Sequence, residues 1–157
     1  MQMPKPASEL KKVDYFAGNW TSEGDMKPGP MGPGGKMIMT ERNQWMEGGF
    51  FLTMQSEFKI AGLGSGTGMA YIGYDADKKI YTYDEFNSMG EVQHSTGTVE
   101  GDTWNWNGKK RLGDSTMKTR FVIKTLSPTS YTFKLEMSLD GNKWSTVMDG
   151  KATKDQF

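Results

Sequence analysis

The chain has 157 residues, which is the size of one domain with a sizeable core. Lysine and arginine together number 19, as do aspartate and glutamate, so the net charge is zero and a strongly basic nucleic-acid-binding surface is excluded. Cysteine is absent, which excludes disulfides and cysteine-based zinc sites, and no apolar run approaches the ~20 residues of a membrane-spanning helix.

The first predicted element is a short helix over residues 7–16 (ASELKKVDYF). Ser8 is the expected N-cap, and Leu10, Val13 and Phe16 share one face of the helix. The remaining chain consists of short alternating runs separated by Gly, Asp, Asn or Pro, which is typical of β-strands. We predict about ten strands, at residues 19–27, 36–46, 50–59, 67–74, 79–87, 91–99, 103–108, 115–126, 130–139 and 143–152.

Short connections join nearly all of these strands. Hairpin turns are predicted at 48–49, 101–102 and 127–129, and only residues 28–35 and 61–66 form longer loops. Greek-key sandwiches need long crossing connections, so the sequence favours a single up-and-down antiparallel β-barrel over about residues 19–153. The glycine-rich stretch 61–66 lacks phosphate-loop spacing, and we expect it to be a flexible loop at the barrel rim.

The hairpin turns also predict which residues face each other across the strands. Side chains alternate along a strand, so paired residues must share a face. The predicted pairs are Met39–Phe58, Glu41–Ser56, Asn43–Met54 and Trp45–Leu52 around 48–49, Val99–Trp104 and Gly97–Trp106 around 101–102, and Phe121–Leu135 and Ile123–Phe133 around Pro128. These pairs bring the apolar residues of neighbouring strands onto one face.

The last hairpin has two alternative registers. A longer turn pairs Met137 with Ser145 and places the apolar residues out of register. A two-residue turn at Asp140–Gly141 pairs Met137 with Trp144 and Phe133 with Met148. We predict the second register because Asp-Gly is a favoured type I′ turn.

The inner face of the predicted barrel is rich in methionine and aromatic residues. The chain holds 13 Met, 5 Trp and 6 Tyr, while Leu, Ile and Val are scarce. A barrel of this lining either encloses a small ligand or is filled by its own side chains, and both alternatives stay open. For the first alternative, the expected cavity wall consists of Glu41, Asn43, Phe50, Met54, Phe121, Tyr131, Phe133 and Met137.

Two residues are candidates for acid–base chemistry. Glu41 lies on the apolar face, where it contacts a polar ligand group, acts as an acid of raised pKa, or lies near the barrel mouth in water. His94, the single histidine, falls on the outer face in the register above, whereas a turn one residue longer would direct it inward as a general base or haem ligand. Asp84 and Glu85 are adjacent and project to opposite faces, so we expect no carboxylate dyad there.

Several motifs, in order along the chain, resemble those of a known family. Residues 14–24 (DYFAGNWTSEG), 48–52 (GGFFL), 71–75 (YIGYD) and 81–83 (YTY) are similar to motifs of a bacterial family called domain of unknown function 1579. The resemblance covers roughly residues 10–153 and implies a calycin-like, lipocalin-related barrel. It brings no agreed activity. Members are often exported, which implies a mature periplasmic or secreted chain here, with the cytoplasm left open.

The opening of the first motif is also similar to that of nitrobindin-type haem barrels. In such barrels the residue that corresponds to Trp20 packs across the closed end, and a histidine near the C-terminal end of the barrel binds haem. This chain has no histidine after position 94, so we expect no cofactor and disfavour haem. The chain's first six residues, MQMPKP, also lack the apolar segment of a signal peptide.

The sequence thus leads to three alternative functions. The first is a binder of a small apolar or amphipathic ligand within the barrel, with loops 28–35 and 61–66 beside its entrance. The second is a calycin-type enzyme that uses Glu41 or His94 as acid or base. The third is a structural or interaction protein whose barrel is filled and holds no ligand. The ligand's identity and the oligomeric state are not specified by the sequence.

Overall fold

The computed structural model describes residues 2–29 and 32–155. Within these ranges, two short 3-10 helices, η1 (Ser8–Lys11) and η2 (Val13–Phe16), precede ten β-strands. The strands are β1 Gly18–Met26, β2 Gly35–Trp45, β3 Leu52–Ile60, β4 Gly64–Asp75, β5 Ile80–Asn87, β6 Val92–Glu100, β7 Thr103–Leu112, β8 Ser115–Ser127, β9 Ser130–Ser138 and β10 Ser145–Lys154. Each predicted strand overlaps one of these.

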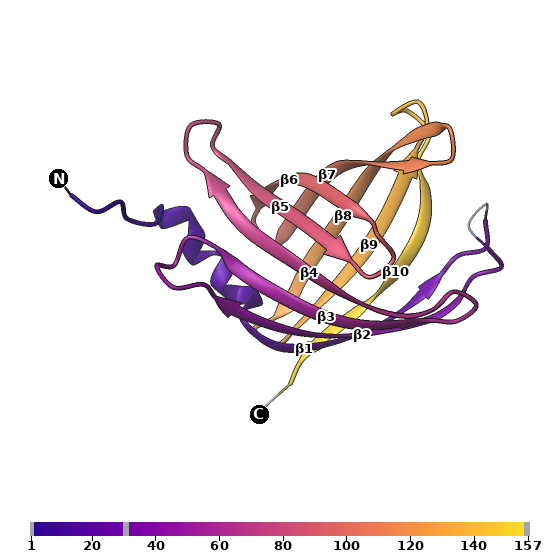
Figure 1. Ribbon diagram of the computed structural model, residues 1–157, viewed down its shortest axis with the longest axis horizontal. Coiled ribbons are helices and arrows are strands. Elements are labelled where there is room, and N and C mark those ends of the chain that lie inside the picture. Colours follow the sequence, from indigo (N-terminus) through magenta and orange to yellow (C-terminus); the bar gives the residue numbers. More distant parts are fainter. Residues whose placement is uncertain (1, 30–31, 156–157) are drawn as a thin grey trace.

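The strands form a closed antiparallel barrel (Figure 1). Each strand pairs with its neighbours in sequence, and β1 also pairs with β10 through seven residue pairs that begin at Trp20–Lys154. Because β1 and β10 pair with each other, neither strand has a row of unpaired backbone N–H and C=O groups at a sheet edge. The predicted all-β, up-and-down barrel of about ten strands with a short N-terminal helix is confirmed.

The N-terminal helical segment differs in detail from the prediction. Leu10, Val13 and Phe16 are all buried, as the shared face requires. The segment is two consecutive 3-10 turns rather than one helix, and Ala7 takes the cap position without a side-chain bond, so the predicted Ser8 cap is wrong. A spacing of three suits this geometry, because a 3-10 helix has three residues per turn and aligns such side chains on one side.

These two turns cover one end of the barrel, which we call the helix end. The Phe16 ring packs edge-on against Trp104 and Tyr131, with centroids 5.4 and 5.6 Å apart. The Trp20 indole donates a hydrogen bond to the Phe16 carbonyl oxygen at 3.0 Å. The Tyr81 hydroxyl donates to the Glu9 carbonyl oxygen at 2.8 Å, which ties η1 to β5. The helix end is thus closed by packing and by hydrogen bonds.

Three of the four predicted hairpin registers are confirmed. Met39 pairs with Phe58 and Trp45 with Leu52, although the connection between β2 and β3 spans residues 46–51 and is longer than two residues. Gly97 pairs with Trp106 in the β6–β7 hairpin. All the pairs predicted around 48–49, 101–102 and Pro128 are present in the barrel.

The predicted register of the β9–β10 hairpin is wrong. Met137 pairs with Ser145, and a bulge between Thr146 and Met148 then places Met148 opposite Leu135. The turn is longer because the Asp140 carboxylate accepts hydrogen bonds from the backbone N–H groups of residues 142 and 143, at 2.7 and 2.9 Å. The bulge returns Met148 to the inner face. Trp144 falls in the turn and lies against the Arg120 guanidinium.

The glycine-rich stretch 61–66 is shorter as a loop than predicted. β4 begins at Gly64, and Gly66 pairs with Phe58. A Cβ at position 66 would lie 2.7 Å from the Phe58 ring, so glycine is needed for this strand to pass beside the ring. Only residues 61–63 remain as the connection between β3 and β4.

Candidate ligand-binding site

The interior of the barrel differs between its two halves. Toward the helix end, the inward side chains are buried in one aromatic-rich cluster. Its members on the strands include Trp20, Leu52, Ile72, Tyr81, Trp104, Trp106, Ile123, Tyr131 and Phe133. Toward the far end, Met37 and Met137 are buried, but most other inward apolar side chains remain half-buried, several of them packed against this cluster. The half-buried ones are Met39, Met54, Phe58, Met117, Phe121, Leu135 and Met148. The lumen is therefore densely packed in one half and less completely buried in the other, which we call the open half.

A pocket of about 380 Å³ lies at the far end of the barrel, which we call the mouth. Met26, Ile60, Met117 and Met137 contribute apolar side chains to it. The rest of its lining comes from the connections 26–34, 60–63 and 138–147, so both loops predicted beside an entrance lie here in their described parts. Residues 30 and 31 lie outside the described residues. The volume is typical of small-molecule sites.

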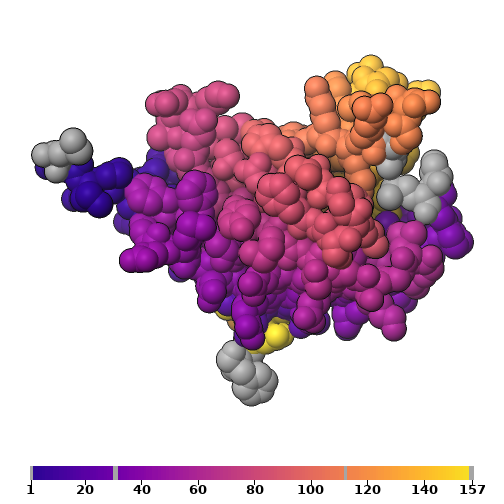
Figure 2. Space-filling model, in the orientation of Figure 1, coloured from indigo at the N-terminus to yellow at the C-terminus, as the bar shows by residue number. Residues whose placement is uncertain are grey.

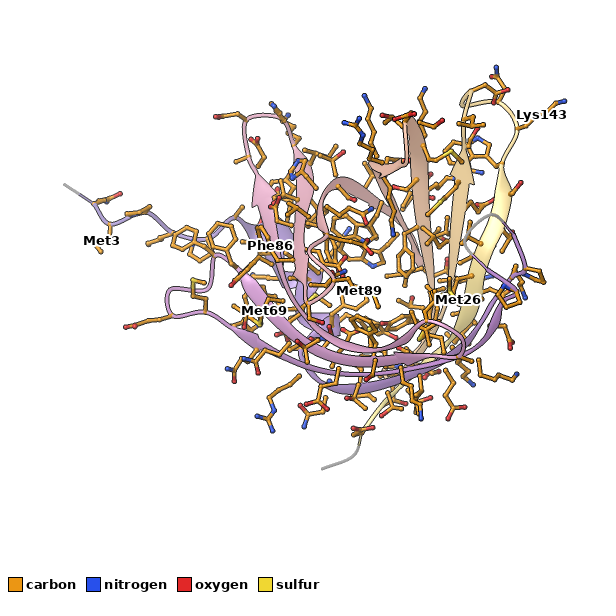
Figure 3. The ribbon with its side chains drawn as sticks, turned by 45° about the vertical axis from the view of Figure 1, so that its right-hand side comes forward. Met3, Met26, Met69, Phe86, Met89 and Lys143 are labelled. Atoms are coloured by element: carbon orange, nitrogen blue, oxygen red, sulfur yellow. The ribbon has the colours of Figure 1, made fainter. Side chains whose placement is uncertain are left out.

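The figures place this pocket relative to the termini. Figure 2 shows the β7–β8 and β9–β10 hairpins, in orange and yellow, at the same end of the barrel as the β1–β2 loop in purple. Figure 3 shows Met26 and Lys143, which both line the pocket, at the end of the barrel away from Met3. The mouth is thus opposite the helix end.

Glu41 and Asn43 project from the inner face of β2, where the packed half meets the open half. Asn43 Nδ2 donates hydrogen bonds to the Phe16 carbonyl oxygen at 2.9 Å and to Glu41 Oε2 at 3.2 Å. Both residues are more than nine-tenths buried. The Asn43 Oδ1 atom is buried and has no hydrogen-bond partner among the described residues. Burial raises the pKa of Glu41, an effect that the hydrogen bond from Asn43 opposes.

A second luminal carboxyl, Glu85 on β5, was not among the predicted site residues. Burial raises its pKa, as does the nearby charge of Glu91, whereas Lys110 lowers it. The charge of Glu85 also contributes to the raised pKa of Glu41. Asp84 projects outward, where its carboxylate lies against His94, so the adjacent carboxyls of Asp84 and Glu85 lie on opposite faces, as expected. The sequence does hold a signal for the inward direction of Glu85, because Tyr81, Tyr83 and Glu85 alternate along one face of β5.

The predicted cavity wall divides between the two halves. Met54 and Phe121 line the open half, and Met137 lies at the mouth. Tyr131 and Phe133 belong to the packed core of the helix end. Phe50 lies in the 46–51 connection at the helix end, so its predicted place on the luminal wall is wrong. The strand pairing ends at Trp45–Leu52, and Phe50 therefore follows no inward alternation.

His94 is on the outer face, as the predicted register required. Its Nδ1 lies 2.6 Å from Asp84 Oδ1, and its side chain is 61% exposed. Glu41 projects to the opposite side of the barrel wall. The two candidate acid–base residues therefore do not meet in one site.

A larger depression of about 700 Å³ lies over strands β2–β4. The side chains of Arg42, Gln55, Glu57 and Thr67, which alternate with luminal residues on these strands, line it from outside. Met69 and Phe86, both labelled in Figure 3, border it. This depression belongs to the outer surface and is wide open, so we assign the candidate ligand site to the mouth and the open half of the lumen.

Within residues 2–29 and 32–155, no group of three or more His, Asp or Glu side chains is arranged to hold a metal ion. In that part of the chain, no helix has both the length and the apolar character needed to cross a membrane.

Replacing Glu41 by glutamine is expected to raise the free energy of unfolding at neutral pH. The pKa of Glu41 is raised above its ordinary value of 4.5. Between that value and the pKa in the folded chain, the folded chain therefore holds a proton that the unfolded chain has released. The stability that the Glu41 carboxyl contributes is therefore fully present at pH values below its ordinary pKa, and it is lost as the pH rises through its pKa in the folded chain. The variant and the natural chain should have equal stability at pH values below the ordinary pKa. Above it, the variant should become the more stable of the two.

Denaturant unfolding across this pH range checks the prediction. Glu57→Gln is the matched control, because Glu57 is exposed on the outer face of β3, and it should leave the pH profile unchanged. A Glu41→Gln variant that is less stable than the natural chain at neutral pH would show that the ionised carboxylate stabilises the fold.

Comparison with known proteins identifies the family. Residues 5–154 match the family described as "Protein of unknown function (DUF1579)", and the chain belongs to this family. The family predicted from the motifs is thus confirmed. No curated protein matches the sequence.

Solved structures share the fold at low sequence identity. The crystal structure of Rv2717c from M. tuberculosis is similar, with a TM-score of 0.68 and 13% identity, over 97% of this chain and 100% of that one. The S-type phycobiliprotein lyase CPES from Guillardia theta is similar, with a TM-score of 0.60 and 10% identity, over 96% of this chain and 94% of that one. These likenesses support the lipocalin-like barrel.

Proposed function

We propose that this protein binds a small amphipathic molecule in the open half of its barrel, which the molecule enters through the mouth. The observation that carries the proposal is the change in the inner face along the barrel axis. Aromatic side chains fill the helix end, whereas half-buried methionines line the other half and continue into the 380 Å³ pocket. A packed-core protein has no need of an apolar lining left half-buried beside a pocket.

The residues of the lining suit an apolar ligand of variable shape. Met117 and Met26 have flexible, polarizable side chains that adapt to irregular partners. The polar groups of the lumen, Glu41 and Glu85, lie deeper than this lining and are suited to orient one polar end of the ligand. The phycobiliprotein lyase CPES has a similar barrel fold.

Filling the mouth is expected to weaken binding. Met117→Trp places a larger ring in the pocket, and the affinity for the neutral fluorescent probe N-phenylnaphthylamine should fall at least about tenfold, or about 1.4 kcal/mol. Met46→Trp is the matched control. Met46 lies exposed in the 46–51 turn at the helix end, so the same substitution there should leave the affinity unchanged.

Fluorescence titration of the natural chain and both variants measures this effect. Native mass spectrometry of the protein purified without added ligand would also report any molecule that copurifies. The proposal fails if the natural chain shows no saturable binding of the probe, or if Met117→Trp and Met46→Trp bind it equally well.

A further inference from the structure

The polar groups at the floor of the open half are mainly hydrogen-bond acceptors. Both N–H donors of the Asn43 amide are already used, one by the Phe16 carbonyl oxygen and one by Glu41. The remaining oxygen, Oδ1, has no partner although Asn43 is only 4% exposed. A buried acceptor without a partner costs free energy unless a water molecule or a ligand supplies a donor.

Glu41 lies beside this acceptor, and Glu85 projects into the same lumen from β5, with β3 and β4 between them. Glu41 pairs with Ser56, and Ser56 in turn pairs with Gly68 on β4. Glu85 pairs with Ala70, the next inward residue on β4. A Cβ at position 68 would lie 2.8 Å from Ser56 Oγ. Three of the inward residues between the two carboxyls, Ser56, Gly68 and Ala70, are therefore small, and the long side chain among them is the flexible Met54.

The charges around these carboxyls are also unbalanced. The charged neighbour of Glu41 is the second acid, Glu85. Lys110 lowers the pKa of Glu85, but its ammonium lies 2.8 Å from the Glu91 carboxylate. The positive charge of Lys110 is therefore shared between Glu85 and Glu91. An incoming cation would thus find two acids and a free amide oxygen, with the local lysine already paired.

We infer that the amphipathic ligand carries an ammonium group, which binds at Glu41, Glu85 and the Asn43 Oδ1 atom while its apolar part lies along the methionines of the open half. An ammonium offers three donors and no acceptor, which complements this set of groups. The ammonium displaces any proton that Glu41 holds in the free protein, and charge-assisted hydrogen bonds to the resulting carboxylate are the strongest that the lumen can provide. The inference rests on the proposed function and specifies its ligand class.

The test compares three molecules with the same tail and different heads. Decylamine, decanol and decanoate, each below its micelle concentration, displace N-phenylnaphthylamine from the natural chain and from variants. Decylamine should bind at least about tenfold more tightly than decanol, and decanoate should bind most weakly. Glu41→Gln should weaken decylamine binding about tenfold and leave decanol binding within about twofold.

Two further variants make the test decisive. Glu85→Gln probes the second carboxyl and should also reduce the preference for the amine, and it stands in for Glu41→Gln if that variant fails to fold. Glu57→Gln, on the outer face, should not alter the preference. A Glu41→Gln variant that is more stable at neutral pH yet binds the amine less tightly would separate a role in binding from a role in folding.

The outcomes distinguish the inference from the function beneath it. Equal affinities for the three molecules would overturn the ammonium site while the binding function stands. The same holds if Glu41→Gln lowers the affinities for decylamine and decanol equally. If neither the probe nor any of the three molecules binds, the proposed function itself is overturned. A preference for the amine that Glu57→Gln abolishes as well would assign the binding to the outer surface and would also overturn the inference.

Discussion

Replacing Trp20 by alanine is expected to lower the free energy of unfolding by about 3–5 kcal/mol. Trp20 is 1% exposed and is among the largest fully buried side chains. Its ring packs against Tyr131 and Tyr15, with centroids 5.0 and 5.6 Å apart. Alanine would leave a cavity between η2 and the strands, and the rings around it are fixed by their own contacts. Denaturant unfolding of the variant and the natural chain measures the difference.

Trp144→Ala is the matched control for this change. Trp144 is half-buried in the β9–β10 turn, where Arg120 lies 4.1 Å from its ring centroid and its indole donates a hydrogen bond to the Gly141 carbonyl oxygen. The same substitution there should cost about 1 kcal/mol. Similar losses at positions 20 and 144 would mean that the helix end is not a rigid core and that its rings can close the cavity.

The closed helix end and the open half have different physical roles. Hydrophobic burial is concentrated near Trp20, Trp104 and Tyr131, so most of the stability of the barrel should arise there. The open half contains half-buried methionines and two carboxyls whose pKa values are raised by burial, which are features that cost stability. This division is why a change at Trp20 should lower stability, whereas a change at Met117 should mainly alter binding and Glu41→Gln should weaken binding without lowering stability.

Much of the fold could be predicted because alternation and turn position determine the direction of each side chain. The pairs Glu41–Ser56 and Phe121–Leu135 follow from counting outward from a turn. The β9–β10 register could not be counted in this way. There the Asp140 side chain accepts backbone hydrogen bonds that lengthen the turn, and the bulge before Met148 then restores the inner face. The first feature is local side-chain chemistry that the Asp-Gly pair alone does not indicate, and the second depends on how β9 and β10 pair.

The candidate site was predicted less well because alternation gives direction but not depth along the barrel. Phe133 and Met137 both face inward from β9, yet one lies in the core of the helix end and the other at the mouth. Depth depends on how the tilted strands wrap around the barrel and on which end the N-terminal segment covers. Glu85 was missed for a related reason, since its neighbour Glu41 comes from a strand far away in the sequence.

Adding a single methyl group at Gly97 is expected to destabilise the barrel by about 1–3 kcal/mol. Gly97 is buried on β6 and pairs with Trp106. A Cβ at position 97 would lie 2.6 Å from the Trp106 Cζ3 atom. The ring has no free space to retreat into, because it stacks on Trp104 at 5.9 Å and lies 5.8 Å from the Tyr83 ring. Relief of the clash must therefore displace several core side chains together.

Gly29→Ala is the matched control, because a Cβ at Gly29 would meet no heavy atom of the described residues within 4 Å. A glycine-to-alanine change without strain stabilises a protein by about 0.4–1 kcal/mol, because it restricts the unfolded chain. The two variants should therefore shift the unfolding midpoint in opposite directions, which a single series of denaturant curves would show. If Gly97→Ala behaves like Gly29→Ala, the stacked tryptophans move freely. The aromatic cluster would then adapt to added volume, and the helix end could no longer be regarded as the rigid floor of the proposed ligand site.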